Sequence, residues 1–293
     1  MTKTVLGIIG GSGVYDISGL ENARWERVSS PWGEPSDSLL FGTLEGVDMV
    51  FLPRHGRGHV HSPTSINYRA NIDALKRASC TDVISVSACG SLREDLPPGH
   101  FVLADQFIDR TYARDKSFFG RGFVAHVSLA HPVCPRLASV LNEAACLENI
   151  PCRLGGTYLA MEGPQFSTLA ESRLYRSWGC DVIGMTAIPE AKLAREAEMP
   201  YAIVAMVTDY DCWHPDHDHV TVEQVIRILF GNADSARALI KRVAPMLGPN
   251  RTPSPLGIER TLDTALITAP DKRDPELFKK LDAVAGRVLR KHS

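Results

Sequence analysis

Strand and helix alternate along almost the whole sequence, and this alternation is the feature that most restricts the fold. Short apolar runs bounded by glycine, proline or aspartate predict buried strands at residues 5–9, 47–52, 82–86, 101–104, 156–159, 182–185 and 202–206. Between them, apolar residues recur every three or four positions and predict helices at residues 65–77, 135–147, 169–178, 189–198 and 222–246. This pattern is typical of a single sheet covered by helices on both faces, so we predict an α/β protein.

The last sixth or so of the 293-residue chain differs from the rest. Residues 248–255 are rich in glycine and proline and are predicted to form a linker. A helix start follows at Asp274, and the apolar stripe after it consists of Leu277, Leu281, Val284 and Val288. We therefore predict one domain over residues 1–247, and a linker and docked helical extension over residues 248–293.

Composition excludes several classes of protein. Hydrophobic residues make up 44% of the chain and charged residues 23%, which is ordinary for a globular protein. The formal charge of −2 gives no electrostatic attraction to nucleic acid or to an anionic membrane. No apolar run approaches the ~20 residues of a membrane-spanning helix. The seven cysteines form no Cys-x-x-Cys pair, which predicts reduced thiols and a cytoplasmic protein.

Three motifs at predicted strand ends are suited to an anion. The Gly-Gly-Ser-Gly run at residues 10–13 lacks the further residues of a dinucleotide or P-loop fingerprint. What remains is a turn that offers amide N–H groups and the Ser12 hydroxyl to a phosphate or sulfate, or a plain tight turn. Arg54 and His55 follow the second predicted strand, and arginine recognises phosphate bidentately. Thr186 lies where a strand meets a helix N-terminus, which also favours anions.

Two acids close together form the most unusual stretch. Asp209 and Asp211 come directly after a buried apolar strand, where carboxylates are costly unless they are paired or used; the alternative is that they cap the next loop. The histidines at 59 and 61 and the His/Asp run at 214–219 have metal-like spacings. We expect no metal at either place. The histidines at 59 and 61 have no acidic or cysteine partner in register, and the short solvated loop at 214–219 cannot preorganise a coordination shell.

These motifs, taken in order, closely resemble those of the S-methyl-5'-thioadenosine phosphorylases, which belong to the trimeric branch of the purine nucleoside phosphorylase family. The matching segments lie between about residue 4 and residue 247 and are Ile9–Gly13, Arg54–Gly56, Asn67–Asn71, Ala88–Leu92, Asp105–Thr111, Glu162–Phe166, Gly184–Glu190 and Thr208–Trp213. The resemblance implies a nucleoside phosphorylase-like fold: a three-layer α/β/α sandwich with a mixed, partly barrel-like central sheet. It also implies a homotrimer whose active sites lie at subunit interfaces.

The resemblance also implies roles for individual residues. The phosphate site would consist of Ser12, Arg54, His55, Ser87, the Ala88 backbone amide and Thr186. The nucleoside would be bound by Met185 under the ribose, Phe166 and the adjacent Ser167 near the purine, Asp209 and Asp211 at the base edge, Val222 and Val225 around a 5'-methylthio group, and His126 reaching the neighbouring subunit's ligand. Asp209 would act as the catalytic proton donor, with Ser12 and His55 acting on phosphate.

The implied activity is a pentosyltransferase (glycosyltransferase) reaction of purine and methionine salvage: phosphate cleaves methylthioadenosine to adenine and 5-methylthioribose-1-phosphate. Inorganic phosphate is a co-substrate, and no cofactor is expected. A free aspartate has a pKa of about 3.9, so a donor role requires burial or Asp211 to raise the pKa of Asp209. A carboxyl at position 209 can accept from the 6-amino group and so favours adenine.

Two other classes of function remain open at this point. One keeps the fold and changes the chemistry, as a 6-oxopurine or methylthioinosine phosphorylase or a nucleoside hydrolase. The other is a non-catalytic protein that binds purine or zinc. We also expect the sequence to depart from the family after the linker, with residues 271–293 extending beyond the usual end of the family's chains. No residue there is assigned as a lid over the 5' pocket.

Overall fold

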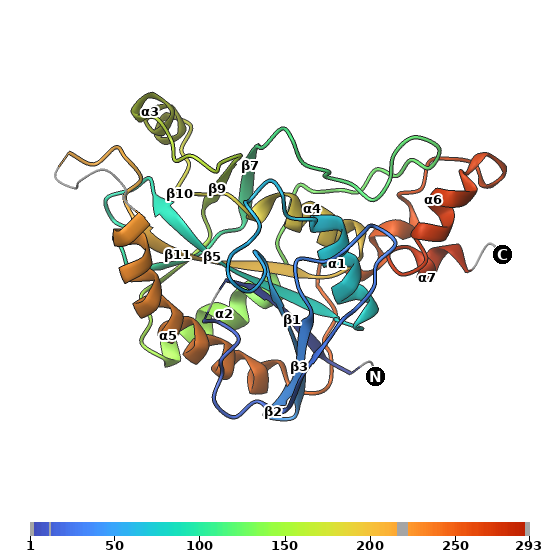
Figure 1. Ribbon diagram of the computed structural model, residues 1–293, viewed down its shortest axis with the longest axis horizontal. Helices are drawn as coiled ribbons and strands as arrows, with labels where there is room; N and C mark the ends of the chain where they lie inside the picture. The colour runs from blue at the N-terminus through green and yellow to red at the C-terminus, as the bar shows by residue number, and fades with distance from the viewer. Residues whose placement is uncertain (1–2, 12, 216–221, 291–293) are drawn as a thin grey trace.

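A computed structural model describes residues 3–11, 13–215 and 222–290, without the side chains of residues 222–227 and 229 (Figure 1). Within these residues, eleven strands form one mixed sheet. The strands are β1 (Val5–Gly10), β2 (Glu21–Glu26), β3 (Leu39–Leu44), β4 (Val47–Pro53), β5 (Asp82–Ser91), β6 (Phe101–Leu103), β7 (Gln106–Arg110), β8 (Cys152–Leu154), β9 (Thr157–Met161), β10 (Val182–Gly184) and β11 (Tyr201–Asp209).

The sheet branches at its long central strand, β5. The main path runs β2-β3-β4-β1-β5-β10-β9-β7, and β11 leaves this path by pairing with β5 and then with β6, which pairs with β8. β1 and β11 both run parallel to β5, whereas β10 is antiparallel to it. Because three strands meet along β5, the last residues of β5 lie between β10 and β11. This confirms the predicted mixed sheet.

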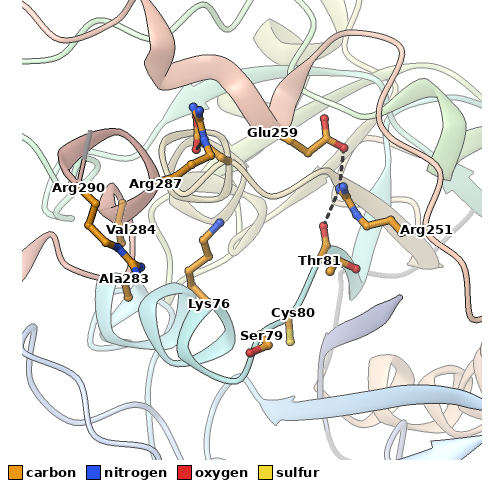
Figure 2. Close-up of a pocket in the computed structure, with 11 residues that line it drawn as sticks. Lys76, Ser79, Cys80, Thr81, Arg251, Glu259, Ala283, Val284, Arg287 and Arg290 are labelled. Atoms are coloured by element: carbon orange, nitrogen blue, oxygen red, sulfur yellow. Dashed lines mark hydrogen bonds and ion pairs between the residues drawn. The ribbon is translucent and has the colours of Figure 1, made fainter. Parts of the chain in front are cut away.

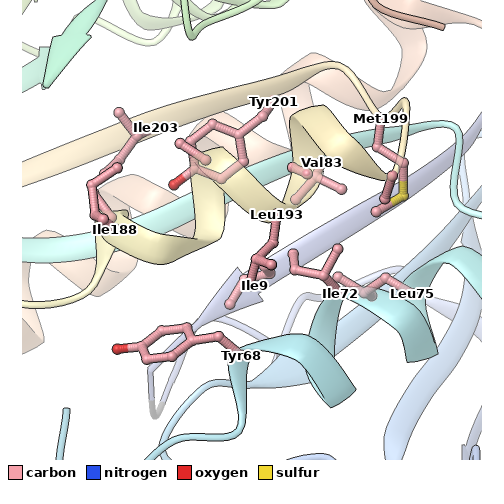
Figure 3. Packing of buried hydrophobic residues seen from close by; sticks show 14 of the residues in the cluster. Ile9, Tyr68, Ile72, Leu75, Val83, Ile188, Leu193, Met199, Tyr201 and Ile203 are labelled. Atoms are coloured by element: carbon pink, nitrogen blue, oxygen red, sulfur yellow. The ribbon is translucent and has the colours of Figure 1, made fainter. Parts of the chain in front are cut away.

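Helices cover both faces of the sheet, which confirms the three-layer arrangement. One face carries α1 (Tyr68–Arg77) and α4 (Ala187–Glu196), and the other carries α2 (Pro135–Leu147) and α5 (Val222–Leu247). Successive residues of a strand point to opposite faces, so Val83 belongs to the first apolar cluster and Ile84 to the second. Figure 3 shows the first cluster, where side chains of α1 and α4 pack over β1, β5 and β11. The short helix α3 (Leu169–Ser177) projects from the sheet edge near β9 and β10 (Figure 1).

The C-terminal extension packs on the first of these clusters. It consists of η1 (Ile258–Asp263), η2 (Pro270–Lys272), α6 (Pro275–Lys280) and α7 (Gly286–Leu289). Asp274 caps α6 as predicted, by accepting from the Leu277 amide at 2.7 Å. The prediction of one continuous tail helix was wrong. Val284, Ala285 and Gly286 are all buried. A straight helix that packs on one side buries residues three or four positions apart, whereas a turn can bury three residues in a row.

All seven predicted strands are present, but β2, β3, β7 and β8 were missed. β2 is exposed along its whole length and so has no apolar pattern to detect. β8 is short, and none of its three residues is buried. Among the described residues, no helix combines the length and the apolar character needed to cross a bilayer.

Candidate active site at the strand ends

Four strands bring the predicted motifs to one edge of the sheet. β4 and β11 run parallel to β1 and β5 respectively, so the carboxyl ends of all four strands face the same way. The ends of β1 and β4 are held in register, with Gly10 opposite Pro53, and the Arg54 amide donates to the Gly10 carbonyl at 2.9 Å. The glycine turn and the Arg54-His55 pair therefore begin side by side, as the sequence predicts. Ser12 itself lies outside the described residues.

Two hydroxyls meet beside this turn. Ser87 of β5 and Thr186 at the start of α4 approach to 3.1 Å between Oγ and Oγ1, although they are 99 residues apart in the chain. Both side chains are buried, and Thr186 occupies the N-cap position of α4. Free amide N–H groups and the helix dipole make such a position favourable to an anion. The structure thus brings together two of the predicted phosphate ligands from different elements.

Arg54 is buried more deeply than a surface ligand for phosphate would be. Its guanidinium is 2% exposed and forms an ion pair with Glu190, with Nε 2.5 Å from Oε1. Nη1 donates to the Val86 carbonyl at 2.9 Å and Nη2 to Ser85 Oγ at 2.6 Å. Much of the guanidinium is therefore bound by protein acceptors next to Ser87. Sequence reasoning missed Glu190 as its partner, although the residue lies in the quoted Gly184–Glu190 motif.

His55 is held as a neutral imidazole. Its Nδ1 lies 2.8 Å from the His61 carbonyl, which can only accept, so Nδ1 carries the proton. Burial, and then the charge of Arg54, lower the pKa of His55 to about 4. Nε2 is thus left as a hydrogen-bond acceptor at neutral pH. The ring also stacks on His59, with 4.1 Å between ring centroids.

Asp209 ends β11 in a buried turn. The pairing of β11 with β5 is irregular between Val207 and Asp209, and Asp209 lies opposite Gly90. Burial raises the pKa of Asp209 to about 6, with a further contribution from the charge of Asp211. Hydrogen bonds from Thr208 Oγ1 at 2.6 Å and from the Asp211 amide at 2.8 Å oppose the rise and hold the carboxyl in place. Burial also raises the pKa of Asp211. The raised pKa that a donor role for Asp209 would require is therefore present, and burial is its main cause.

Gly90 makes room for this carboxyl. A Cβ at position 90 would lie 2.9 Å from Asp209 Oδ1 and 3.3 Å from the Asp211 Cβ. Trp213 fixes the far side of the turn, because its indole Nε1 donates to the Ser91 carbonyl at 2.7 Å. The end of β5 therefore positions both acids.

Met185 is held by a buried network that the sequence did not reveal. The guanidinium of Arg114 donates to the Met185 carbonyl, to the Ile188 carbonyl at 2.7 Å and to the Glu162 carbonyl at 2.6 Å. Gly163 has a φ of +66°, and a Cβ there would lie 2.5 Å from Met185 Sδ. Arginine at 114 is one of many on the chain and has no motif around it, so no signal singled it out.

The loop after β9 carries the predicted purine contacts. Phe166 is 44% exposed, and Ser167 touches the acid turn through its carbonyl, to which Cys212 Sγ donates at 3.4 Å. The loop ends at a capping box formed by Thr168 and Glu171, which starts α3. An exposed ring beside two buried carboxyls suits a planar, partly polar ligand.

His126 is the predicted site residue that this chain does not bring to the others. Its amide donates to the Ala265 carbonyl at 2.9 Å, and the adjacent Ala125 bridges to Leu266. In Figure 1 the green segment around residues 120–128 runs toward α6, away from the end of β11. The side chain of His126 is exposed.

Three further predictions fall partly or wholly outside the described residues. The side chains of Val222 and Val225 are not described, and neither is most of the His/Asp run at 214–219. In the part of the chain that is described, no group of three His, Cys, Asp or Glu side chains is arranged to hold a metal ion.

Comparison with known proteins gives a consistent result. Residues 5–244 match the family described as the Phosphorylase superfamily. A protein of Rhodospirillum rubrum named S-methyl-5'-thioadenosine phosphorylase is 66% identical over 287 residues, covering 98% of each chain. The expectation that residues 271–293 extend beyond the family's chains was therefore wrong for this relative, which is matched through most of that segment. A methylthioadenosine phosphorylase from an antarctic soil metagenomic library has a similar structure, with a TM-score of 0.91, 44% identity and 97% and 99% of the two chains covered.

A solved complex adds ligand information about a more distant relative. It is a variant of the adenosine/methylthioadenosine phosphorylase of Schistosoma mansoni in complex with methylthioadenosine. This chain matches it with a TM-score of 0.80 and 37% identity, over 84% of this chain and 92% of that one.

Proposed function

The chain belongs to the Phosphorylase superfamily, among the S-methyl-5'-thioadenosine phosphorylases, and from this premise we propose which of its residues carry the reaction. The reaction is the phosphate-dependent cleavage of S-methyl-5'-thioadenosine to adenine and 5-methylthioribose-1-phosphate. The bond from C1' to the adenine nitrogen breaks, and a bond from C1' to a phosphate oxygen forms. The departing adenine takes up a proton.

The observation that carries the proposal is the state of Asp209. Adenine leaves with negative charge and needs a proton at N7, and a carboxyl with a pKa of about 6 still holds a proton in about a tenth of molecules at pH 7. An ordinary aspartate would hold almost none. The same carboxyl can accept a hydrogen bond from the 6-amino group of adenine. Facing a 6-carbonyl, it would be left unpaired, which is costly in a buried site.

Phosphate would bind next to this group along the sheet edge. The β5–β11 register puts Asp209 beside Gly90, three residues or about 10 Å along the strand from Ser87. The phosphate oxygens would accept hydrogen bonds from four groups: Ser87, Thr186, the Ala88 amide and Ser12. Arg54 would supply positive charge next to them. His55 Nε2 is an acceptor, so it suits the hydroxyl of a protonated phosphate. Positioned phosphate both attacks C1' and stabilises the positive charge that develops on the ribose.

The 5' end of the nucleoside would be bound between chains. We propose that Val222 and Val225 pack on the methylthio group, and that Met185 and Phe166 contact the ribose and the purine, with Ser167 and Asp211 lining the same face. His126 lies on a segment held against Ala265 and Leu266, away from the end of β11, and we propose that it completes the site of a neighbouring subunit in a homotrimer.

Two further features complete the proposal. The reaction needs inorganic phosphate and no other cofactor, because charge stabilisation and one proton transfer account for the chemistry. We propose a cytoplasmic location, in keeping with the seven free cysteines of the chain.

The phosphate site is tested by removing its two paired hydroxyls. Ser87→Ala and Thr186→Val should each raise the KM for phosphate about tenfold, since a hydrogen bond to a charged group is lost, and should change the KM for methylthioadenosine little. Thr43→Val is a matched control, because Thr43 lies on β3 and bonds to Asp48. An unchanged phosphate KM in both site variants would contradict this assignment.

A further inference from the structure

A cavity of about 550 Å³ lies at the opposite end of β5 from the active site (Figure 2). It is bordered by the end of α1, the residues that lead into β5, and the C-terminal extension. Thr81 lines it, one residue before β5 begins, whereas Ser87 and Gly90 lie at the other end of that strand. Glu198 also lines it, just after α4 ends, whereas Thr186 precedes the start of that helix. The cavity is therefore separate from the site described above.

The lining carries excess positive charge. Four of its side chains are cationic and two are anionic; these are Lys76, Arg251, Arg287 and Arg290, with Glu198 and Glu259. Both carboxylates are already neutralised. Arg287 Nη2 lies 2.5 Å from Glu198 Oε1, and Arg251 Nη2 lies 2.6 Å from Glu259 Oε1.

Two of these cations have no carboxylate partner among the residues that the structure describes. The ammonium group of Lys76 makes no hydrogen bond or close ion pair with the described residues, and Glu198 attracts it only from farther away. Figure 2 shows its side chain directed into the space below Arg287. Arg290 donates to the Gly286 carbonyl at 3.3 Å and has no ion pair among these residues. Burial lowers the pKa of Lys76, so the protein alone does not compensate this charge.

The two paired arginines are preorganised as well. Arg251 is 11% exposed and is fixed on one side by Asp82 at 3.2 Å and by the Thr81 carbonyl at 3.1 Å. Arg287 is fixed by Asp263 at 2.6 Å as well as by Glu198. These two arginines are therefore fixed in place, but their charge is balanced by carboxylates. The unpaired Lys76 and Arg290 beside them are left to give phosphoryl oxygens charge-assisted hydrogen bonds, which are strong and directional.

We propose that this cavity is a second anion-binding site, for a phosphorylated small molecule, with Lys76 and Arg290 as the residues that neutralise it. A cavity of this volume is large enough for a sugar phosphate or a nucleotide. Only the phosphoryl group is specified by the cations.

The test is equilibrium binding of inorganic pyrophosphate and, separately, of ribose 5-phosphate to the full chain, measured by calorimetry at low salt. Pyrophosphate stands for the phosphoryl chain of a nucleotide, and ribose 5-phosphate for a sugar monophosphate. At least one should bind the unaltered protein at this site. Lys76→Met should weaken that binding about tenfold, which is the loss of one favourable charged contact. Arg290→Met should weaken it similarly and serves if Lys76→Met does not fold.

Two controls separate this site from the others. Lys279→Met removes an exposed lysine of α6 that pairs with Glu276 outside the cavity, and should leave binding unchanged. Ser87→Ala alters the strand-end site and should also leave this binding in place. The proposal is overturned if neither probe binds, if Lys76→Met and Arg290→Met bind as the unaltered protein does, or if Ser87→Ala abolishes all binding.

Discussion

The chemistry of Asp209 is set by where β11 ends. Burial favours the protonated carboxyl, while the Thr208 hydroxyl and the Asp211 amide favour the carboxylate. Burial prevails, and the pKa reaches about 6. The residue is thus available both as a proton donor and as an acceptor within the working pH range of most enzymes.

The proton-donor role makes a prediction about pH. A donor must be protonated, and its protonated fraction falls about tenfold for each pH unit above a pKa of about 6. The kcat/KM for methylthioadenosine, which reports the free enzyme, should therefore fall as pH rises above 6. Asp209→Asn should lower kcat/KM about a hundredfold at pH 6 and flatten this limb.

Phosphate also titrates in this range, so the variant serves as the reference. Any slope that remains in Asp209→Asn belongs to phosphate, and the difference between the two profiles belongs to Asp209. Equal turnover by the two proteins at pH 6 would rule out the donor role.

For individual residues, the sequence indicated the members of the candidate site better than it indicated the partners that hold their side chains and backbone in place. Asp209 and Thr186 stand in motifs at strand ends, whereas Ser87, within β5, was indicated by the family resemblance. The partners Glu190 and Arg114 could not, because their contacts join residues 136 and 71 positions apart and depend on the folded register. A buried ion pair of this kind has no local pattern.

At the scale of elements, the site depends on how closely β5 and β11 approach. Gly90 is the point of contact, since a side chain there would meet the Asp209 carboxyl. The two strands otherwise pair regularly from Tyr201 to Val207, so the irregularity falls only where the carboxyl turns toward the site.

Gly90→Ala tests this contact. The added methyl should displace Asp209 and lower kcat about tenfold or more, because small misplacements of a catalytic group are costly. The matched control is Gly231→Ala in α5, where an added Cβ has no atom within 4 Å. It should stabilise the helix by about 0.5–1 kcal/mol and leave kcat unchanged. Full activity of Gly90→Ala, with kcat and the melting temperature measured together, would show that the approach is not needed.

The elements themselves could be predicted where burial imposes a pattern. β5 and β11 are buried along nearly their whole length and appear as apolar runs in the sequence. β2 could not be predicted, because its six residues are exposed and its place in the sheet comes from pairing with β3. The stripe after Asp274 correctly predicted docking, but not the turn that divides α6 from α7, which follows from burial on more than one face.

At the scale of the whole molecule, the chain separates one predicted site residue from the rest. His126 is held against the segment around Leu266, while Asp209 lies at the end of β11. A site built from both would need two copies of the chain. We expect a trimer of about three times the 32.1 kDa chain mass in sedimentation equilibrium.

Hybrid assemblies test the shared site. His126→Ala and Asp209→Asn should each lower kcat/KM for methylthioadenosine when assembled alone. Co-expressed with different tags and purified as mixed oligomers, they should recover activity above either parent, because some interfaces combine an intact Asp209 with an intact His126. Activity no higher than the average of the parents would indicate that each site is complete within one chain.

The most direct test of the whole account is the set of products formed from methylthioadenosine, adenosine and methylthioinosine, each with and without phosphate, separated by chromatography. The account predicts adenine and 5-methylthioribose-1-phosphate, formed only with phosphate and fastest from methylthioadenosine. Faster cleavage of methylthioinosine would contradict the reading of Asp209, and release of base without phosphate would contradict the reading of the anion site.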